Sequence, residues 1–292
     1  MFAGPAAAQP AAAPVQQARV DDPGHPAITV AIWAPAAGSD LPLVILSHGT
    51  GAGPASHLDT ARALAEAGFV VAAPMHVGDN FQDDSAVGKP NWFVDRARQV
   101  SRVIDFLYGP WAGHARLRPN RVGIFGFSAG ATTALIAIGG TPDLAGIPAY
   151  CARQPEFACK LMAPPAAAPP AWTHDPRIAA AVIAAPGIGF AFAPSGLAKV
   201  KVPVQLWTGE ADQTVPTATN AAVVRRLLRG PVDFHSVPGA VHFSFLAPCG
   251  PDFPPQFCQD TAGFDRAAFH RDMNRAIVDF FRARLATPAQ RR

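Results

Sequence analysis

Arg121-Val-Gly-Ile-Phe-Gly-Phe-Ser-Ala-Gly130 is the segment on which the predicted fold chiefly rests. Apolar, β-prone residues lead into Gly126-Phe-Ser-Ala-Gly130, and small residues that suit a helix follow at 131–137. This order predicts a strand, a tight turn and a helix. The residues at 126 and 130 must be small because such a turn brings the strand and the helix close together.

The five residues at 126–130 fit Gly-x-Ser-x-Gly, a pattern that pushes a serine hydroxyl into a cleft on a strained strand-to-helix turn. The N-terminus of the following helix offers free N–H groups and a positive dipole end to a developing oxyanion. A glycine-rich connecting loop is the alternative interpretation. The strand before the motif and the helix after it favour a nucleophilic Ser128.

Strands and helices alternate along the chain. The patterns predict strands at 27–34, 43–46, 69–73, 122–125, 177–185, 202–208 and 232–237, and helices at 56–68, 94–107, 131–137, 217–228 and 264–285. Most of the strands are continuous apolar runs, which is typical of parallel strands buried on both faces. We therefore expect an α/β fold with a mostly parallel central sheet and helices on both of its faces.

The expected domain begins after an Ala/Pro-rich lead-in. We expect residues 1–26 to be disordered, and their first part to be the remnant of an export signal or a lead-in of an exported protein. A single domain is expected over 27–287. The irregular, Pro- and Ala-rich segment at about 139–176 is expected to be an insertion or small lid within it.

The composition argues against two kinds of partner. The chain has 292 residues, of which 49% are hydrophobic and 15% charged, with a net charge of +3. So small and dispersed a positive charge does not fit nucleic-acid binding. No apolar run reaches the roughly 20 residues that a transmembrane helix needs. We expect neither a nucleic-acid partner nor a transmembrane segment.

The four cysteines form two close pairs, Cys151 with Cys159 and Cys249 with Cys258. Neither pair has Cys-x-x-Cys spacing and no histidine stands at zinc-finger spacing, so we expect no metal site. Both pairs lie in proline-rich loop sequence, which favours two local disulfides and an oxidising compartment. Four cysteines allow three pairings, and four reduced cysteines in a cytosolic enzyme are the alternative.

Two further polar residues follow strands at the sheet edge where chemistry gathers in such folds. Asp212 lies just past the strand at 202–208, and His242 lies just past the next strand. The chain order Ser128, Asp212, His242 is that of α/β-hydrolases. We expect Ser128 to attack a carbonyl, His242 to carry the proton, and Asp212 to orient the imidazole. Glu210 is the rival carboxylate, and a turn-capping Asp212 is the alternative.

An oxyanion needs two N–H donors. We expect one from Ala129, the residue after the nucleophile, and one from the glycine-rich loop after the strand at 43–46, with Thr50 as the candidate. His48 in that loop is expected to be structural, and His76 is a candidate for the cleft wall.

Four aromatic residues in expected loops are candidates for the substrate pocket, although core packing is the alternative for at least half of them. They are Phe127, Trp92, Phe243 and Phe245.

Several motifs resemble those of the α/β-hydrolase superfamily over about 27–285. They are Ser47-His-Gly-Thr-Gly, Gly126-Phe-Ser-Ala-Gly130, Gly209-Glu-Ala-Asp212 and Val241-His242. The motifs at 75–80, 96–105 and 242–249 resemble those of exported predicted dienelactone hydrolases, a group similar to platelet-activating-factor acetylhydrolases and bacterial polyester hydrolases. Dienelactone hydrolases use a cysteine nucleophile. Ser128 in that place implies a general esterase rather than dienelactone cleavage.

We therefore expect a secreted or periplasmic serine carboxylesterase that needs no cofactor. Its substrate would be a small-molecule or polymeric ester. An amidase or peptidase with the same three residues, a polyester hydrolase, and a non-catalytic binding protein of the same fold are the alternatives.

Overall fold

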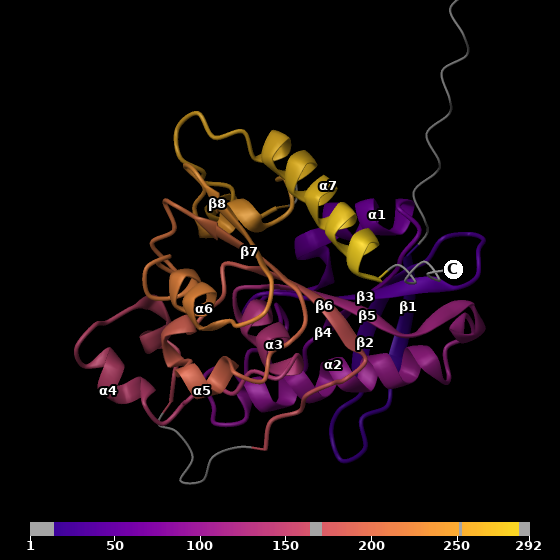
Figure 1. Cartoon of the computed structure of the whole chain (residues 1–292), viewed down its shortest axis with the longest axis horizontal. Coiled ribbons are helices and arrows are strands. Elements are labelled where there is room, and N and C mark those ends of the chain that lie inside the picture. Colours follow the sequence, from indigo (N-terminus) through magenta and orange to yellow (C-terminus); the bar gives the residue numbers. More distant parts are fainter. Residues whose placement is uncertain (1–14, 164–170, 251–252, 286–292) are drawn as a thin grey trace, which may run out of the picture.

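A computed structural model of the protein describes residues 15–163, 171–250 and 253–285. Eight strands form one sheet in the order β1-β2-β4-β3-β5-β6-β7-β8 (Figure 1). The strands are β1 (Val15–Val20), β2 (Ile28–Trp33), β3 (Leu41–Ser47), β4 (Val70–Met75), β5 (Leu117–Phe127), β6 (Ile178–Ala184), β7 (Val204–Gly209) and β8 (Val232–Val237). The pairings from β4 through β3 to β8 are parallel, and β2 is antiparallel to both β1 and β4. The expected mostly parallel sheet is confirmed.

Helices cover both faces of the sheet, as Figure 1 shows. They are α1 (Leu58–Glu66), α2 (Trp92–Tyr108), α3 (Ala129–Ala137), α4 (Ile147–Cys151), α5 (Pro194–Leu197), α6 (Ala221–Leu227) and α7 (Arg266–Leu285). Side chains from α2, α3, α5 and α6 pack in one apolar cluster with the sheet, and those of α1 and α7 pack in another. Neighbouring residues of β2 divide between the clusters: Ile32 faces the first and Trp33 the second. This is the alternation that a strand buried on both faces produces.

The expectation of a disordered lead-in up to residue 26 is wrong from residue 15 onward. β1 pairs with β2 along its whole length, and residues 1–14 lie outside the described residues. Asp22, which is 4% exposed, forms ion pairs with Arg98 and Arg102 of α2. The pattern in β1 was missed because an edge strand with largely exposed, polar side chains lacks apolar alternation.

Several helix boundaries differ from the expected ones. α2 begins at Trp92, so Trp92 lies on a helix rather than in a loop, and α3 begins directly after Ser128. α6 begins at residue 221 rather than at 217, since the backbone of Asn220 is not helical, and the Asn220 side chain accepts a hydrogen bond from the Gly189 N–H at 2.7 Å.

The two expected local disulfides are confirmed. Cys151 is bonded to Cys159 and Cys249 to Cys258. We call residues 151–159 the first disulfide loop and residues 249–258 the second. The first loop lies within the expected insertion at 139–176, which carries α4 and a 3-10 turn at Phe157–Lys160, and of which 164–170 lie outside the described residues.

None of the helices in the described part of the chain has both the length and the apolar character needed to cross a membrane.

Candidate active site

Ser128 occupies the tight turn between β5 and α3. Its φ is +55°, in the left-handed region that non-glycine residues rarely adopt. A Cβ on Gly126 would lie 2.1 Å from the Gly130 carbonyl oxygen, and a Cβ on Gly130 would lie 1.9 Å from that of Ser47. The expected strained turn with obligatory small neighbours is therefore present.

Ser128, His242 and Asp212 lie in one chain of hydrogen bonds. Nε2 of His242 is 3.0 Å from Ser128 Oγ, and Nδ1 of His242 is 2.7 Å from Asp212 Oδ2. Because a carboxylate can only accept, Nδ1 carries the proton and Nε2 accepts from the serine hydroxyl. The three residues come from loops after β5, β7 and β8, at the carboxyl edge of the sheet where they were expected.

The second oxygen of Asp212 is also occupied. Asp212 Oδ1 accepts the backbone N–H groups of Thr214 at 2.9 Å and Val215 at 2.7 Å. These bonds fix the carboxylate so that Oδ2 points at the imidazole. The rival Glu210 is exposed and accepts from Ser236 Oγ at 2.9 Å, away from His242.

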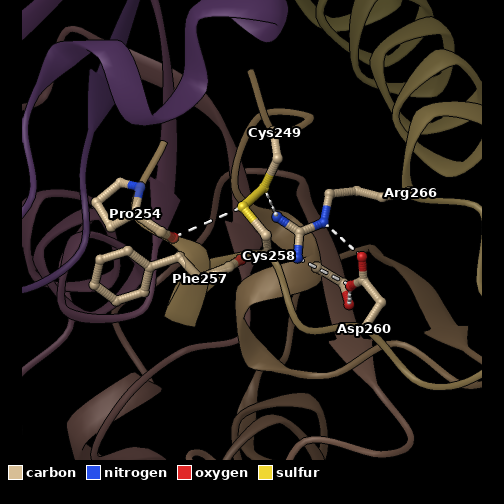
Figure 2. Close-up of a disulfide and its surroundings, with 7 residues drawn as sticks. Cys249, Pro254, Phe257, Cys258, Asp260 and Arg266 are labelled. Atoms are coloured by element: carbon tan, nitrogen blue, oxygen red, sulfur yellow. Dashed lines mark hydrogen bonds and ion pairs between the residues drawn. A yellow bond between two sulfur atoms is a disulfide. The ribbon is translucent and has the colours of Figure 1, made fainter. Parts of the chain in front are cut away.

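The 3-10 turn His242–Phe245 is tied to the second disulfide loop. Ser244 Oγ in the turn donates to Asp260 Oδ1 at 2.6 Å. Arg266 donates to the two oxygens of Asp260 at 2.9 and 3.0 Å and to the Phe257 carbonyl at 2.8 Å, as Figure 2 shows. Asp260 and Arg266 therefore connect the turn that carries His242 with the second disulfide loop.

The residues that carry the two expected oxyanion donors, Thr50 and Ala129, both line the cavity that contains Ser128. Within the described residues the Thr50 N–H has no hydrogen-bond acceptor, and the Ala129 N–H is the first of α3 and has none within the helix. Both groups are thus available to a ligand.

A buried ion pair, which the sequence interpretation missed, braces the loop that carries Thr50. Asp79 Oδ1 accepts the Gly51 N–H at 2.7 Å, and Asp79 Oδ2 accepts from Trp92 Nε1 at 2.6 Å and from Arg96. Arg96 also donates to the His48 carbonyl. Asp79 and Arg96 stand in two of the motifs that carry the family resemblance, but no spacing in the sequence connects the one with the other.

Arg96 is also linked, through Thr133, to Ala129, the residue that carries the second expected oxyanion donor. Its Nε donates to Thr133 Oγ1 at 2.9 Å, and Thr133 Oγ1 donates to the Ala129 carbonyl at 2.8 Å. One guanidinium therefore connects the loop of Thr50 with the first turn of α3.

His48 and His76 are parts of this buried network. His48 Nδ1 donates to the Gly49 carbonyl at 2.8 Å, while its Nε2 accepts the His76 N–H at 3.1 Å. Burial, with a smaller effect of the Arg96 charge, lowers the pKa of His48 to about 3, and the same causes lower that of His76. The structural role expected for His48 agrees with these contacts. The suggestion that His76 lines the cleft is wrong, because its ring is buried between Ser47 Oγ and Gln99.

A cavity of about 880 Å³ opens beside Ser128 and His242. Phe127, Trp92 and Phe243 line it, as expected of pocket residues, although Phe127 and Trp92 are also largely buried in apolar clusters. The Phe127 ring lies 4.8 Å from the His242 ring, measured between centroids. Phe245 is fully buried and does not line the cavity, so its suggested pocket role is wrong.

The part of the chain that the structure describes contains no cluster of three or more histidine, cysteine or acidic side chains placed to hold a metal ion.

The amino-acid sequence matches the model of one known protein family. The sequence model of the dienelactone hydrolase family matches residues 29–285, which is most of the chain. No curated protein sequence matches this one.

Solved structures give the fold. A dienelactone hydrolase from Anabaena variabilis aligns with a TM-score of 0.60 at 17% identity, covering 94% of this chain and all of that one. A puromycin-hydrolysing peptidase from Mycobacterium tuberculosis aligns with a TM-score of 0.65 at 16% identity. This second alignment covers 98% of this chain but only 42% of the peptidase. At such identities the likeness concerns the fold, which is that of the α/β-hydrolases.

Proposed function

Since the chain belongs to the dienelactone hydrolase family, we propose that it is a serine hydrolase that cleaves carboxylic esters through an acyl-enzyme on Ser128. The observation that carries the proposal is the hydrogen-bond chain from Ser128 through His242 to Asp212, with distances of 3.0 and 2.7 Å. A serine in place of a cysteine favours general ester hydrolysis over the reaction in the family's name.

The proposed reaction has two halves. Ser128 Oγ attacks the ester carbonyl carbon while His242 Nε2 takes the hydroxyl proton, which forms a tetrahedral oxyanion. The carbon–oxygen bond to the alcohol then breaks, and His242 returns the proton to the departing oxygen. Water attacks the acyl-enzyme in the same way and releases the acid and free Ser128. Asp212 holds the imidazole in the required tautomer and stabilises its cationic form.

The oxyanion would bind to the Thr50 and Ala129 N–H groups. Their lack of acceptors in the described residues supports this role. The Arg96–Asp79 pair would keep both donors in position, because its hydrogen bonds reach the loop of Thr50 and the first turn of α3. Donors fixed in advance stabilise a transition state without reorganisation. Phe127, Trp92 and Phe243 would contact the substrate from the cavity wall.

We also propose that the protein works in an oxidising compartment, secreted or periplasmic, because disulfides persist in such places. The elements from β1 to α7 would form a single domain, with 139–176 as an insertion beside the cavity. Phe157, Ala158 and Leu161 of this insertion line the cavity, which supports a role as a wall.

The test is hydrolysis of p-nitrophenyl esters from acetate to decanoate by the wild type and by Ser128→Ala. Loss of the nucleophile should lower kcat by about 10⁴- to 10⁶-fold. Retention of ester hydrolysis by Ser128→Ala would overturn the proposal. A matched ester and anilide distinguish the esterase from an amidase or peptidase, and a higher kcat/KM for the anilide would reassign the reaction.

A further inference from the structure

The cavity beside Ser128 is lined mainly by apolar side chains. Its walls come from β2, from the loop after β3, from the insertion and from the second disulfide loop. None of the described residues that line it is an aspartate, glutamate, lysine or arginine, and His242 is the one titratable side chain among them. A volume of about 880 Å³ lies near the upper end of typical small-molecule pockets, roughly 300–1,000 Å³.

Apolar walls lie on both sides of the nucleophile. In the sheet, β2 and β6 lie on opposite sides of β5, whose end carries Ser128. Ala31 and Trp33 of β2 line the cavity, and so does Ile188, which follows β6. An ester whose carbonyl lies at Ser128 can therefore bury apolar groups on both its acyl and its alcohol side. A carboxylate on either group would lose its hydration without a cationic partner among the described lining residues, which is costly.

Large hydrophobic side chains are exposed to solvent at the opening of this cavity. Within the described residues, the large hydrophobic residues that are exposed are Val15 (44%), Phe81 (67%) and Phe157 (48%), and all three line the cavity. Single exposed hydrophobic residues are ordinary on a protein surface, but their convergence on one opening marks an interaction site. We call Val15, Phe81 and Phe157 the apolar rim.

Two of the rim residues lie on braced segments. The Phe81 N–H donates to the Ala52 carbonyl at 2.9 Å, which joins Phe81 to the loop after β3. Phe157 lies within the first disulfide loop, two residues before Cys159. The second disulfide loop, drawn in Figure 2, contributes Phe253, Pro254 and Phe257 to the cavity wall. Covalent bracing reduces the conformational entropy that these aromatic groups lose when they bind a surface.

We propose that the substrates are neutral esters with bulky apolar groups on both sides of the carbonyl, and that the enzyme takes them from an aggregated phase, such as droplets, which the apolar rim contacts. This rests on the proposed ester hydrolysis at Ser128. The apolar walls on both sides of Ser128 can enclose a single small ester molecule. The apolar rim extends this apolar surface to the outside of the protein, where it can contact the droplet.

The first test uses tributyrin, a neutral ester that forms droplets above its solubility limit, and p-nitrophenyl acetate as a dissolved ester. The wild-type rate on tributyrin should rise steeply once droplets form. In Phe81→Ser/Phe157→Ser, the ratio of the droplet rate to the dissolved-ester rate should fall about tenfold for each phenylalanine removed. The matched control Gln82→Ser/Gln154→Ser changes exposed neighbours that do not line the cavity and should keep the wild-type ratio.

The second test compares p-nitrophenyl valerate with the p-nitrophenyl monoester of glutaric acid, which has the same acyl chain ending in a carboxylate. We expect kcat/KM for the neutral ester to be at least about 100-fold higher. Three results would overturn the inference: equal use of the charged ester, a tributyrin rate that saturates below the solubility limit, or an unchanged ratio in the rim variant. Dimerisation that is lost in the rim variant would assign the rim to a second copy of the chain instead. Absence of any ester hydrolysis by the folded wild type would refute the proposed function itself.

Discussion

Removal of Arg96 should destabilise the protein far more than loss of an ordinary surface ion pair. Arg96 is 1% exposed and Asp79 is 0% exposed, so no water replaces the lost partner. Arg96→Met would leave a buried carboxylate without its cation and the His48 carbonyl without its donor. Breaking a buried pair from one side costs about 3–5 kcal/mol. At about 2–3 °C per kcal/mol, Tm should fall by roughly 6–15 °C.

The assay is urea and thermal unfolding of the wild type, Arg96→Met, Asp79→Asn and the double variant. Because the double variant removes both charges, its cost should be at least about 2 kcal/mol smaller than the sum of the single costs. Arg275→Met is the control, since Arg275 and Asp272 form an ion pair in which both side chains are more than 70% exposed. Its cost should be under about 1 kcal/mol. Equal costs for Arg96→Met and Arg275→Met, or additive single costs, would show that the buried pair contributes no more to stability than an exposed one.

Three further predictions concern the site and its support. Asp212→Asn should lower kcat by about 10⁴-fold with an unchanged fold, because the amide favours the wrong tautomer of the imidazole, whereas the exposed Glu210→Gln should keep wild-type kcat. A loss of kcat in Glu210→Gln but not in Asp212→Asn would exchange their roles. Burial, with smaller and opposing effects of nearby charged groups, lowers the pKa of His57 from 6.5 to about 4. Between these pH values the unfolded chain therefore binds more protons than the folded protein. The contribution of His57 to the free energy of unfolding rises with pH across this window, by about 1 kcal/mol per pH unit, and is constant above it. His57→Phe should flatten the slope of unfolding free energy against pH in this window, and an unchanged slope would assign the dependence to other groups. Gly130→Ala should prevent folding or abolish activity, because its Cβ would overlap the Ser47 carbonyl oxygen; near-normal expression and kcat would mean that the turn and β3 can separate.

The sequence allowed the sheet and the three hydrogen-bonded polar residues to be predicted because both follow from local patterns. Buried parallel strands are continuous apolar runs, and the edge at which they end brings together residues that directly follow them, as with Asp212 and His242. The glycines at 126 and 130 indicated the tight turn because the backbone there leaves no room for a Cβ atom.

The features that were missed depend on tertiary contacts. β1 is recognisable only from its pairing with β2, since three of its six residues are polar, four are exposed, and its apolar residues do not alternate regularly. The Arg96–Asp79 pair joins residues from a loop and a helix, and no spacing rule connects them. His76 follows a strand, as a pocket residue would, but Gln99 and Ser47 hold its ring inside the network.

Transfer of an acyl group to Ser128 can be measured by mass spectrometry of the enzyme quenched during turnover of a p-nitrophenyl ester. We predict that the protein gains the mass of the acyl group, that the gain maps to the peptide containing Ser128, and that Ser128→Ala shows none. An acyl group on another residue, or turnover by Ser128→Ala at the wild-type rate, would contradict this prediction.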